Sequence, residues 1–335
     1  MKILVVSMLY DYGKKERGYS YDYYNMYSSL KNTYNDVRFF DYFSLFQKKG
    51  KKIMNEEILS YIKREKPDLA IFSLYRDEFI PEILDEIKKY TITLCYFWDD
   101  QWRVNFTKFW APYFSYITTP DFNGIRKWQE RGYSNVIYSP FGCNHFLYKK
   151  KNLPQKYDVS FVGMHHPYRD WILKKIKKAG INVFTVGAGW ENGYVSYEEI
   201  INIFNQSKIN LNLSNSQSWD LRYILSSLRT MKATLVSLKG KEEPKNKEQI
   251  KGRHFEICGC GGFQMSYYVE GIEHCYEIGK EIVVFLGIED LIDKIKYYLK
   301  YEDEREKIAN AGYRRALADH TYEKRFREII SHIGL

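Results

Sequence analysis

The sequence predicts an α/β protein built from two Rossmann-like, doubly wound domains that face a central cleft. Its 335 residues exceed what one hydrophobic core usually covers, which favours two domains of roughly 150 residues each. Short apolar runs rich in β-formers alternate with longer helical patterns, as in βαβ units. Between residues 139 and 158, prolines, a glycine and lysines interrupt any regular element and divide the chain into halves.

The first half predicts one doubly wound domain over residues 1–147. The candidate strands are Ile3–Ser7, Val37–Phe40, Leu69–Ser73, Thr91–Phe97, Tyr116–Thr119 and Val136–Tyr138. The candidate helices between them are Tyr21–Asn32, Asn55–Glu65, Ile80–Tyr90 and Phe122–Arg131.

The second half repeats the alternation and predicts a second domain over residues 148–319, joined by a linker near Tyr148–Lys156. Its candidate strands are Asp158–Val162, Asn182–Val186, Ile209–Leu213, Gly262–Ser266 and Ile282–Phe285. Its candidate helices are Tyr168–Lys178, Ser196–Gln206, Arg253–Cys258, Ile288–Leu299 and Asp303–Asp319. We expect residues 320–335 to form a C-terminal helix that packs back on the first domain. The cleft between the domains is the expected active site, because open α/β sheets bind ligands at the carboxyl ends of their strands.

Composition narrows the class of protein. A hydrophobic content of 44% with 28% charged residues is typical of a globular chain. The net charge of +9 would attract nucleotides, anionic membrane surfaces and nucleic acid alike. No apolar window reaches the roughly 18 to 20 residues of a membrane span, and Ile3–Leu9 is too short for a secretory signal, so we expect a cytoplasmic protein, compatible with peripheral membrane contact.

The five cysteines are an odd number in a chain without an export signal, which indicates reduced thiols. Cys258 and Cys260 are one residue apart, which is not a zinc spacing, and no second cysteine pair or histidine set completes four ligands. We therefore predict no structural metal.

The segment from Lys251 to Phe285 carries the chemistry. Lys251, Arg253 and Glu256 precede a glycine-rich turn that contains Gly261 and Gly262. A nucleotide diphosphate sugar needs such groups, because cations and free N–H groups bind pyrophosphate and a fixed carboxylate accepts hydrogen bonds from ribose. The same residues would also suit a buried helix and strand with solvated charges.

Three stretches of the chain resemble the GT-B glycosyltransferases, and within them the CgeB-like group. They are the linker pattern with Pro140, Gly142 and Phe146, the K-x-R-x-F-E segment followed by glycines, and the tail from Gly279 to Arg325 with its ANAGYRRALADHTYEKR run. The resemblance covers about Asp158–Arg327 with good specificity and the first domain only in outline.

The resemblance implies a GT-B architecture and transfer of a sugar, of hexosyl type, from a nucleotide diphosphate sugar to a glycan, lipid-linked or protein acceptor. It implies that the enzyme needs neither a metal nor any other cofactor. It also implies a role in polysaccharide biosynthesis. Glu256 is expected to bind the donor ribose, and Arg253 with Lys251 the diphosphate. Gly163 would let the backbone approach the phosphates, and Arg169 is a further diphosphate candidate.

Glu248 precedes Glu256 with seven residues between them, a spacing that many retaining GT-B enzymes use for one sugar ligand and one ribose ligand. Glutamates are also common in lysine-rich insertions such as Gly240–Lys251, so coincidence stays open. Trp219, Asp220 and Arg222 are candidates for contacts with the donor sugar or base. His165, directly after the Gly163 turn, is a candidate proton or hydrogen-bond donor to the leaving group, whereas His145 and His254 are predicted to be structural.

In the first domain, Asp99 and Asp100 follow an apolar strand, where either could act as general base or bind the acceptor hydroxyl. A helix N-cap with an acidic first turn is the structural alternative. Tyr10, Asp11 and Arg17, in the loop after the first strand, are candidate acceptor contacts.

Two other functions stay open. A nucleotide-sugar epimerase can share the two-domain fold, and fold alone does not exclude it. A non-catalytic, basic coat or nucleic-acid-binding protein is less well supported, because the lysines form no helix-face stripe and no nucleic-acid motif occurs.

Overall fold

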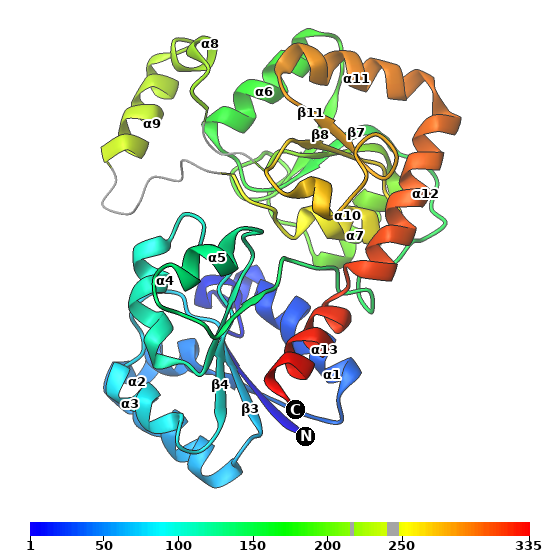
Figure 1. The fold of residues 1–335 in the computed structure, drawn as a ribbon. Coiled ribbons are helices and arrows are strands. Elements are labelled where there is room, and N and C mark those ends of the chain that lie inside the picture. Colours follow the sequence, from blue (N-terminus) through cyan, green and yellow to red (C-terminus); the bar gives the residue numbers. More distant parts are fainter. Residues whose placement is uncertain (215–217, 240–247) are drawn as a thin grey trace. The chain divides into compact units, whose positions relative to one another are not determined.

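The computed structural model describes residues 1–214, 218–239 and 248–335 and divides them into two compact units (Figure 1). The first unit contains Met1–Leu147 together with Tyr322–Leu335, and the second contains Tyr148–Thr321. Each unit is an α/β domain with one parallel sheet.

The sheet of the first unit has the order β2-β1-β3-β4-β5-β6, and every neighbouring pair is parallel. The strands are β1 (Lys2–Ser7), β2 (Asp36–Asp41), β3 (Leu69–Phe72), β4 (Ile92–Cys95), β5 (Tyr116–Thr119) and β6 (Val136–Tyr138). Chain order reverses at β1, so the carboxyl ends of β1 and β3 form the topological switch point at which such sheets bind ligands.

Two apolar layers cover the two faces of this sheet, because alternate residues of a strand point to opposite faces. Leu4 and Val6 belong to one core cluster, with helices α2 (Tyr42–Glu65) and α3 (Pro81–Ile87). Ile3 and Val5 belong to the other, which includes Leu30 of α1 (Ser28–Thr33) and residues of α13 (Tyr322–Ile333). The C-terminal helix thus belongs to the core of the first unit.

Several elements of this unit differ in length from the expectation. Helix α2 begins at Tyr42 rather than Asn55, because Asp41 caps its first turn by accepting from the Ser44 amide at 3.1 Å. Gly50, at φ +85°, interrupts the helical backbone upstream of Asn55, where the expected helix began. Helix α1 is preceded by a π-helical turn, Tyr23–Tyr27. Helices α4 (Val104–Trp110) and α5 (Gly124–Gln129) complete the unit; α4 was not expected.

The sheet of the second unit has the order β11-β10-β9-β7-β8 and is also entirely parallel. Its strands are β7 (Tyr157–Val162), β8 (Val183–Val186), β9 (Ser207–Asn212), β10 (Gln264–Tyr267) and β11 (Val283–Phe285). Its helices are α6 (Pro167–Lys178), α7 (Tyr197–Gln206), α8 (Leu221–Ile224), α9 (Leu228–Lys239), α10 (Arg253–Gly259), α11 (Ile288–Lys300) and α12 (Glu302–Asp319). Helices α8 and α9 were not expected.

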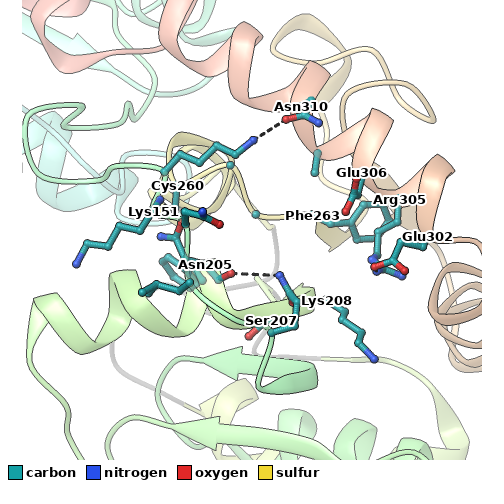
Figure 2. A pocket seen from close by; sticks show the side chains of 18 residues that line it. Lys151, Asn205, Ser207, Lys208, Cys260, Phe263, Glu302, Arg305, Glu306 and Asn310 are labelled. Carbon is teal, nitrogen blue, oxygen red and sulfur yellow. Dashed lines mark hydrogen bonds and ion pairs between the residues drawn. The ribbon is translucent and has the colours of Figure 1, made fainter.

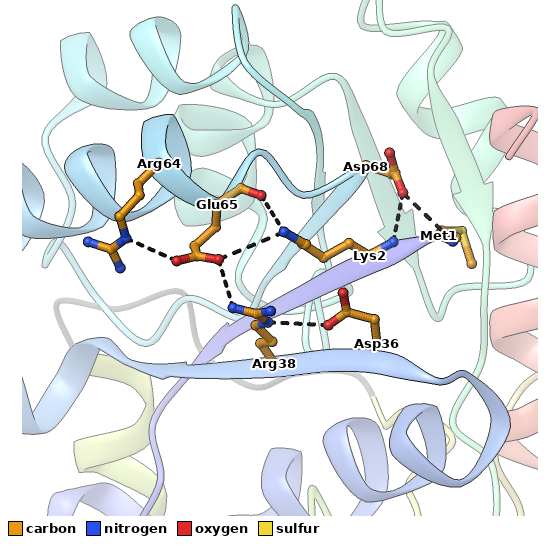
Figure 3. A network of polar contacts seen from close by, with 7 residues as sticks. All are labelled: Met1, Lys2, Asp36, Arg38, Arg64, Glu65 and Asp68. Atoms are coloured by element: carbon orange, nitrogen blue, oxygen red, sulfur yellow. Dashed lines mark hydrogen bonds and ion pairs between the residues drawn. The ribbon is translucent and has the colours of Figure 1, made fainter.

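A network of polar contacts ties the amino ends of β1 and β2 to the end of α2 (Figure 3). Glu65 accepts from Arg38 at 2.7 Å and Arg64 at 2.9 Å, and Asp68 accepts from the Lys2 amide at 2.6 Å. These groups are partly exposed to solvent, so each pair contributes little to stability. The network lies at the edge of the sheet opposite the carboxyl ends, which gives it a structural role.

In the part of the chain that the structure describes, no helix is both long enough and apolar enough to cross a membrane.

Candidate functional site

At the carboxyl edge of the second sheet, the turns that follow β7 and β8 lie very close together. Gly163 follows β7, and its amide donates to the Val186 carbonyl at the end of β8 at 3.0 Å. Gly187, next along β8, has φ +127°, and a Cβ there would lie 2.3 Å from the Gly163 carbonyl oxygen. Only glycine fits this position, so the two strand ends stay close and the turn leads directly into α6.

Arg169 lies in the first turn of α6 and is directed back to this turn, since its Nη1 donates to the Met164 carbonyl at 2.9 Å. Burial lowers the pKa of its guanidinium to about 10; Glu248 opposes that shift, and the charge of Arg253 adds to it. Its Nε is buried with no hydrogen-bond partner among the described residues. A partly desolvated cation beside a second one is stabilised by any anion that enters.

Arg253, the first residue of α10, forms an ion pair with Glu256 one turn later. Its Nε donates weakly to the Val162 carbonyl at 3.4 Å, and its guanidinium lies over the Phe204 ring, 5.5 Å from the centroid. Arg253 therefore sits at the carboxyl end of β7, on the same side as Arg169.

Glu256 is completely buried, and its Oε1 has no hydrogen-bond partner within the described part of the chain. An open carboxylate oxygen is what a ribose hydroxyl requires, but a ligand reaches this one only if neighbouring side chains move. In this structure Glu256 forms an ion pair with Arg253 and thereby holds that cation in position.

His254 holds the backbone of this segment in place. Its Nδ1 accepts from the Lys251 amide at 3.0 Å, and its Nε2 lies 3.1 Å from the Ser266 hydroxyl on β10. Burial lowers its pKa to about 4, so the ring is neutral at neutral pH. These bonds set where Lys251 and Arg253 leave the backbone, in line with a structural histidine.

Glu248 is close enough to Arg169 and to Tyr267, at the end of β10, to shift the pKa of both groups. The structure therefore brings Glu248, Arg169, Arg253 and Glu256 together at one edge of the sheet. Residues 240–247 of the predicted lysine-rich insertion lie outside the described residues.

The two glycines Gly261 and Gly262 lie elsewhere, and their expected place in the diphosphate site needs correction. They precede β10 and thus stand at the amino edge of the sheet, opposite Gly163 and Arg169. A Cβ on Gly262 would meet the Asn210 amide at 2.8 Å, and one on Gly261 would meet the Lys150 side chain at the same distance. Close packing explains both glycines.

At that amino edge the structure has a hollow of about 250 Å³ (Figure 2). The linker, the end of α7, the glycine turn and α12 line it. Its polar groups bond to one another: Lys150 donates to Asn310 at 2.7 Å, and Asn205 accepts from the Lys151 amide at 2.6 Å. Neither Arg169 nor Arg253 lines this hollow.

Two polar residues at the carboxyl edge were missed by sequence reasoning. Asn212 ends β9, between β7 and β10, and Ser214 follows it. Both are buried, and neither the Asn212 Nδ2 nor the Ser214 hydroxyl has a hydrogen-bond partner among the residues described. A signal existed: both residues follow an apolar run that reads as a strand, and open parallel sheets bind ligands at the carboxyl ends of their strands.

The other predicted residues of this unit are engaged locally. The His165 amide donates to Ala188 at 2.7 Å, and its ring packs edge-on against Trp190. His166 caps α6 by accepting from the Tyr168 amide at 3.3 Å.

The predicted base or sugar contacts lie at the start of α8. Asp220 caps the helix and pairs with Arg222, which also pairs with Glu289 at 2.5 Å. Trp219 is exposed beside them.

In the first unit, the two predicted aspartates differ in environment. Asp100 is buried, accepts from the Trp128 indole at 3.1 Å, and has its pKa raised to about 6 by burial. Asp99 is half-buried, and its carbonyl accepts from the Arg103 amide at 2.9 Å. The N-cap alternative is wrong, because the next helix begins at Val104 and its N-cap residue is Arg103.

The loop after β1 forms a compact turn. Tyr10 bridges and stacks on Tyr19, with ring centroids 5.7 Å apart, and the Asp11 carboxylate lies 3.8 Å from Arg17. Burial raises the pKa of Asp11. Tyr12 of this loop is near enough to Asp99 for their charges to interact, so the expected acceptor contacts and Asp99 share one edge of the sheet.

Asp22 also escaped the sequence analysis. It is buried at the switch point, where it accepts from the hydroxyl of Ser7 at the end of β1. Burial raises its pKa, opposed by hydrogen bonds from Ser7, Ser73 and Trp98. Nothing in its sequence context, SYDYY, distinguishes it from a surface helix residue.

No cluster of three or more His, Cys, Asp or Glu side chains that could hold a metal ion occurs among the described residues. The five cysteines are all buried, and they form no disulfide among the described residues.

Comparison with known proteins bears on both units. Residues 169–331 match the family described as glycosyl transferase-like. The spore protein CgeB of Bacillus subtilis (strain 168) is 22% identical over 226 residues, which are 62% of this chain and 64% of that protein. The match therefore spans less than two thirds of the length of that curated relative.

Solved structures show the likeness in fold. Anabaena HepE in complex with UDP and glucose has a TM-score of 0.64 at 11% identity, covering 100% of this chain and 99% of that one. Sucrose-phosphate synthase from Thermosynechococcus elongatus has a TM-score of 0.62 at 10% identity, covering 100% and 98%. A glycosyltransferase from Rickettsia africae gives 0.60 at 11% identity, covering 99% and 97%. The predicted two-domain architecture is confirmed by these likenesses.

Proposed function

We propose that this chain, which has the GT-B fold and resembles the CgeB-like glycosyltransferases in sequence, transfers a sugar from a nucleotide diphosphate sugar to an acceptor. The observation that carries the proposal is that two cations, Arg169 and Arg253, lie close together at the carboxyl edge of the second sheet. We call these two residues the arginine pair. The resemblance implies the same two arginines for the diphosphate, which supports the proposal.

The diphosphate of the donor is the proposed ligand of this arginine pair. Arg169 has an open Nε donor and a lowered pKa, and both features disappear when a phosphate oxygen accepts from it. The narrow turn at Gly163 and Gly187 leaves backbone close to the same space. Asn212 and Ser214 supply further hydrogen-bonding groups on the neighbouring strand.

Catalysis in this proposal is stabilisation of the departing diphosphate. As the bond from the sugar to the diphosphate breaks, negative charge grows on the leaving oxygens, and Arg169, Arg253 and Lys251 would neutralise it. We propose that these protein cations make a metal ion unnecessary.

The acceptor is proposed to bind at the carboxyl edge of the first sheet, through Tyr10, Asp11 and Arg17. Asp99 is the better candidate for general base, because Asp100 is buried and accepts from Trp128. Asp22, at the switch point of the same edge, is also buried and accepts from Ser7, so it is set aside for the same reason. A glycan, a lipid-linked glycan or a protein hydroxyl would all suit these groups, and a hexose is the proposed sugar.

A thermal-shift screen with UDP, GDP, TDP, CDP and their common sugar conjugates tests the proposal, since a ligand of the folded state raises its melting temperature. UDP is the first candidate, because HepE was solved with it. We expect one nucleoside diphosphate to raise the melting temperature of the wild type and to have a smaller effect on Arg253→Ala. A flat response to every nucleotide by folded protein would contradict the proposal.

A further inference from the structure

Helix α9 has its apolar side turned to solvent. Leu228, Met231 and Leu235 are spaced i, i+3 and i+7, which puts them on one helix face, and all three are exposed, Leu228 by 82%. The opposite face carries Thr230, which is only 6% exposed, with Ala233 and Thr234 half-buried. A helix of a globular protein normally shows the reverse arrangement.

The exposed apolar side chains continue beyond α9 into the short helix before it. Leu221 of α8 and Leu225 after it are 68% and 71% exposed, and Val236 follows on α9. We call this surface the α8–α9 face; it consists of Leu221, Leu225, Leu228, Met231, Leu235 and Val236. Contiguous apolar patches of this kind mark interaction sites.

The small polar face of α9 is turned toward the protein. The Thr230 hydroxyl donates to the Ile224 carbonyl of α8 at 3.2 Å and to the Ser227 carbonyl at 2.7 Å. Helix α9 packs on α6 and α8 (Figure 1). Turning the leucines of α9 inward would bury exposed cations in the place of Thr230.

The segment that forms the face carries charges of one sign. Between Leu221 and Lys239 the sequence has four cations and no carboxylate. Arg222 is paired with Asp220 and Glu289, whereas Arg229 and Lys232 are exposed, Lys232 within the apolar face itself. Helix α6, on which α9 packs, adds the exposed Lys175, Lys177 and Lys178, while its Lys174 is paired with Asp170.

We propose that the α8–α9 face binds the surface of an anionic lipid membrane, with its leucines among the acyl chains and its cations at the headgroups. Interfacial helices combine an apolar face with Lys and Arg in this way, and long cationic side chains keep their charge in the headgroup layer. Pairing with a second copy would set Arg229 and Lys232 against the same cations of a chain of net charge +9. Charge complementarity thus favours the lipid surface over a second copy.

Sedimentation with lipid vesicles tests the proposal. Vesicles of phosphatidylcholine with about 30 mol% phosphatidylglycerol should bind the full chain, and vesicles of phosphatidylcholine alone should bind it much more weakly. Leu228→Gln with Leu235→Gln should lower the partition coefficient at least about tenfold, and Arg229→Gln with Lys232→Gln should remove most of the dependence on phosphatidylglycerol and on salt.

The matched control is Ile53→Gln with Phe109→Gln, two exposed apolar residues on the first unit, which should bind vesicles as the wild type does. All these sites are exposed, so unchanged thermal melting should confirm that each variant folds. Equal vesicle binding by the leucine variant and the wild type would overturn the proposal. So would a wild-type dimer in sedimentation equilibrium that the leucine variant loses. Nucleotide binding should not change in the leucine variant or in the Arg229 and Lys232 variant. Failure of this proposal and failure of the glycosyltransferase proposal are therefore distinguishable.

Discussion

Arg169 shows how a single side chain can be prepared for an anion. It is anchored by one hydrogen bond to Met164, it is partly desolvated, and it lies near a second guanidinium. Desolvation and the neighbouring charge raise the free energy of the site without a ligand and make phosphate binding more favourable. The hydrogen bond to Met164 holds the guanidinium in position.

We therefore expect Arg169→Ala to weaken nucleoside diphosphate binding by about 1.5 to 3 kcal/mol, the value of a hydrogen bond to a charged group. The corresponding nucleoside should lose much less. Titration calorimetry of both ligands measures the difference, and Lys174→Ala, an exposed residue of the same helix, is the control. Equal loss for nucleoside and diphosphate would show that the variant disturbs the fold rather than the phosphate contact.

Asp100 illustrates the opposite case, a carboxyl group that burial penalises. Its pKa of about 6 in the folded state lies above the unfolded value, so its favourable contribution is present below about pH 4 and is lost as the pH rises through 6. Asp100→Asn should match the wild type near pH 4 and be more stable by about 2 to 3 kcal/mol at pH 8, given 1.36 kcal/mol per pKa unit.

Urea unfolding at several pH values checks this, with Asp293→Asn, an exposed carboxylate, as the control. A pH-independent difference between Asp100→Asn and the wild type would mean that the carboxyl group ionises in the fold as it does in the unfolded chain.

The position of a candidate residue could be predicted where it follows from that residue's own strand or helix. Arg253, Glu256 and Gly163 lie at one edge of a sheet, as the order of the predicted elements implied. Gly261 and Gly262 lie at the opposite, amino edge of the sheet. The predicted strand that starts at Gly262 already implied this position. Asp22 could not be predicted, because its burial depends on Ser7, Ser73 and Trp98 from three separate strands or strand ends.

At the scale of elements, the strands were the most predictable part. Tyr116–Thr119 and Val136–Tyr138 have the expected bounds, because short β-branched and aromatic runs between polar turns are typical of buried parallel strands. Helices α8 and α9 were missed for a physical reason. Leu221, Leu228 and Leu235 face solvent, so most of the apolar pattern does not describe packing against this chain.

Helix α13, at the C-terminal end of the chain, packs into the core of the first unit and stabilises it. Tyr322, Phe326, Ile329, Ile330 and Ile333 are all buried in its core. Burial of each large apolar side chain contributes about 1.5 to 3 kcal/mol, so together they match the whole stability of a typical domain.

A chain that ends at Thr321 should therefore lose the folded first unit and keep the second. Calorimetry and circular dichroism should show loss of the corresponding helix and heat absorption, while nucleotide binding remains. Removal of only Gly334 and Leu335, which are exposed, should have no effect. A truncated chain that unfolds with the heat absorption of the wild type would show that α13 is dispensable.

At the scale of the whole molecule, the chain combines two parallel-sheet units with an excess of nine positive charges. The fold class followed from the alternation of strands and helices, whereas ligand identity depends on loop residues whose course only the structure gives. The proposed donor groups belong to the second unit and the proposed acceptor groups to the first. Both sets lie at carboxyl edges, where open parallel sheets bind their ligands.

The most direct test of the central claim is hydrogen–deuterium exchange with and without the nucleoside diphosphate that the thermal screen selects. Binding at the arginine pair should slow exchange in residues 160–170 and 251–258 of the second unit and leave residues 8–20 of the first unit unchanged. Protection around Lys150 and Asn310 at the opposite edge of the sheet, or in residues 8–20, with none at Arg169 and Arg253, would contradict it.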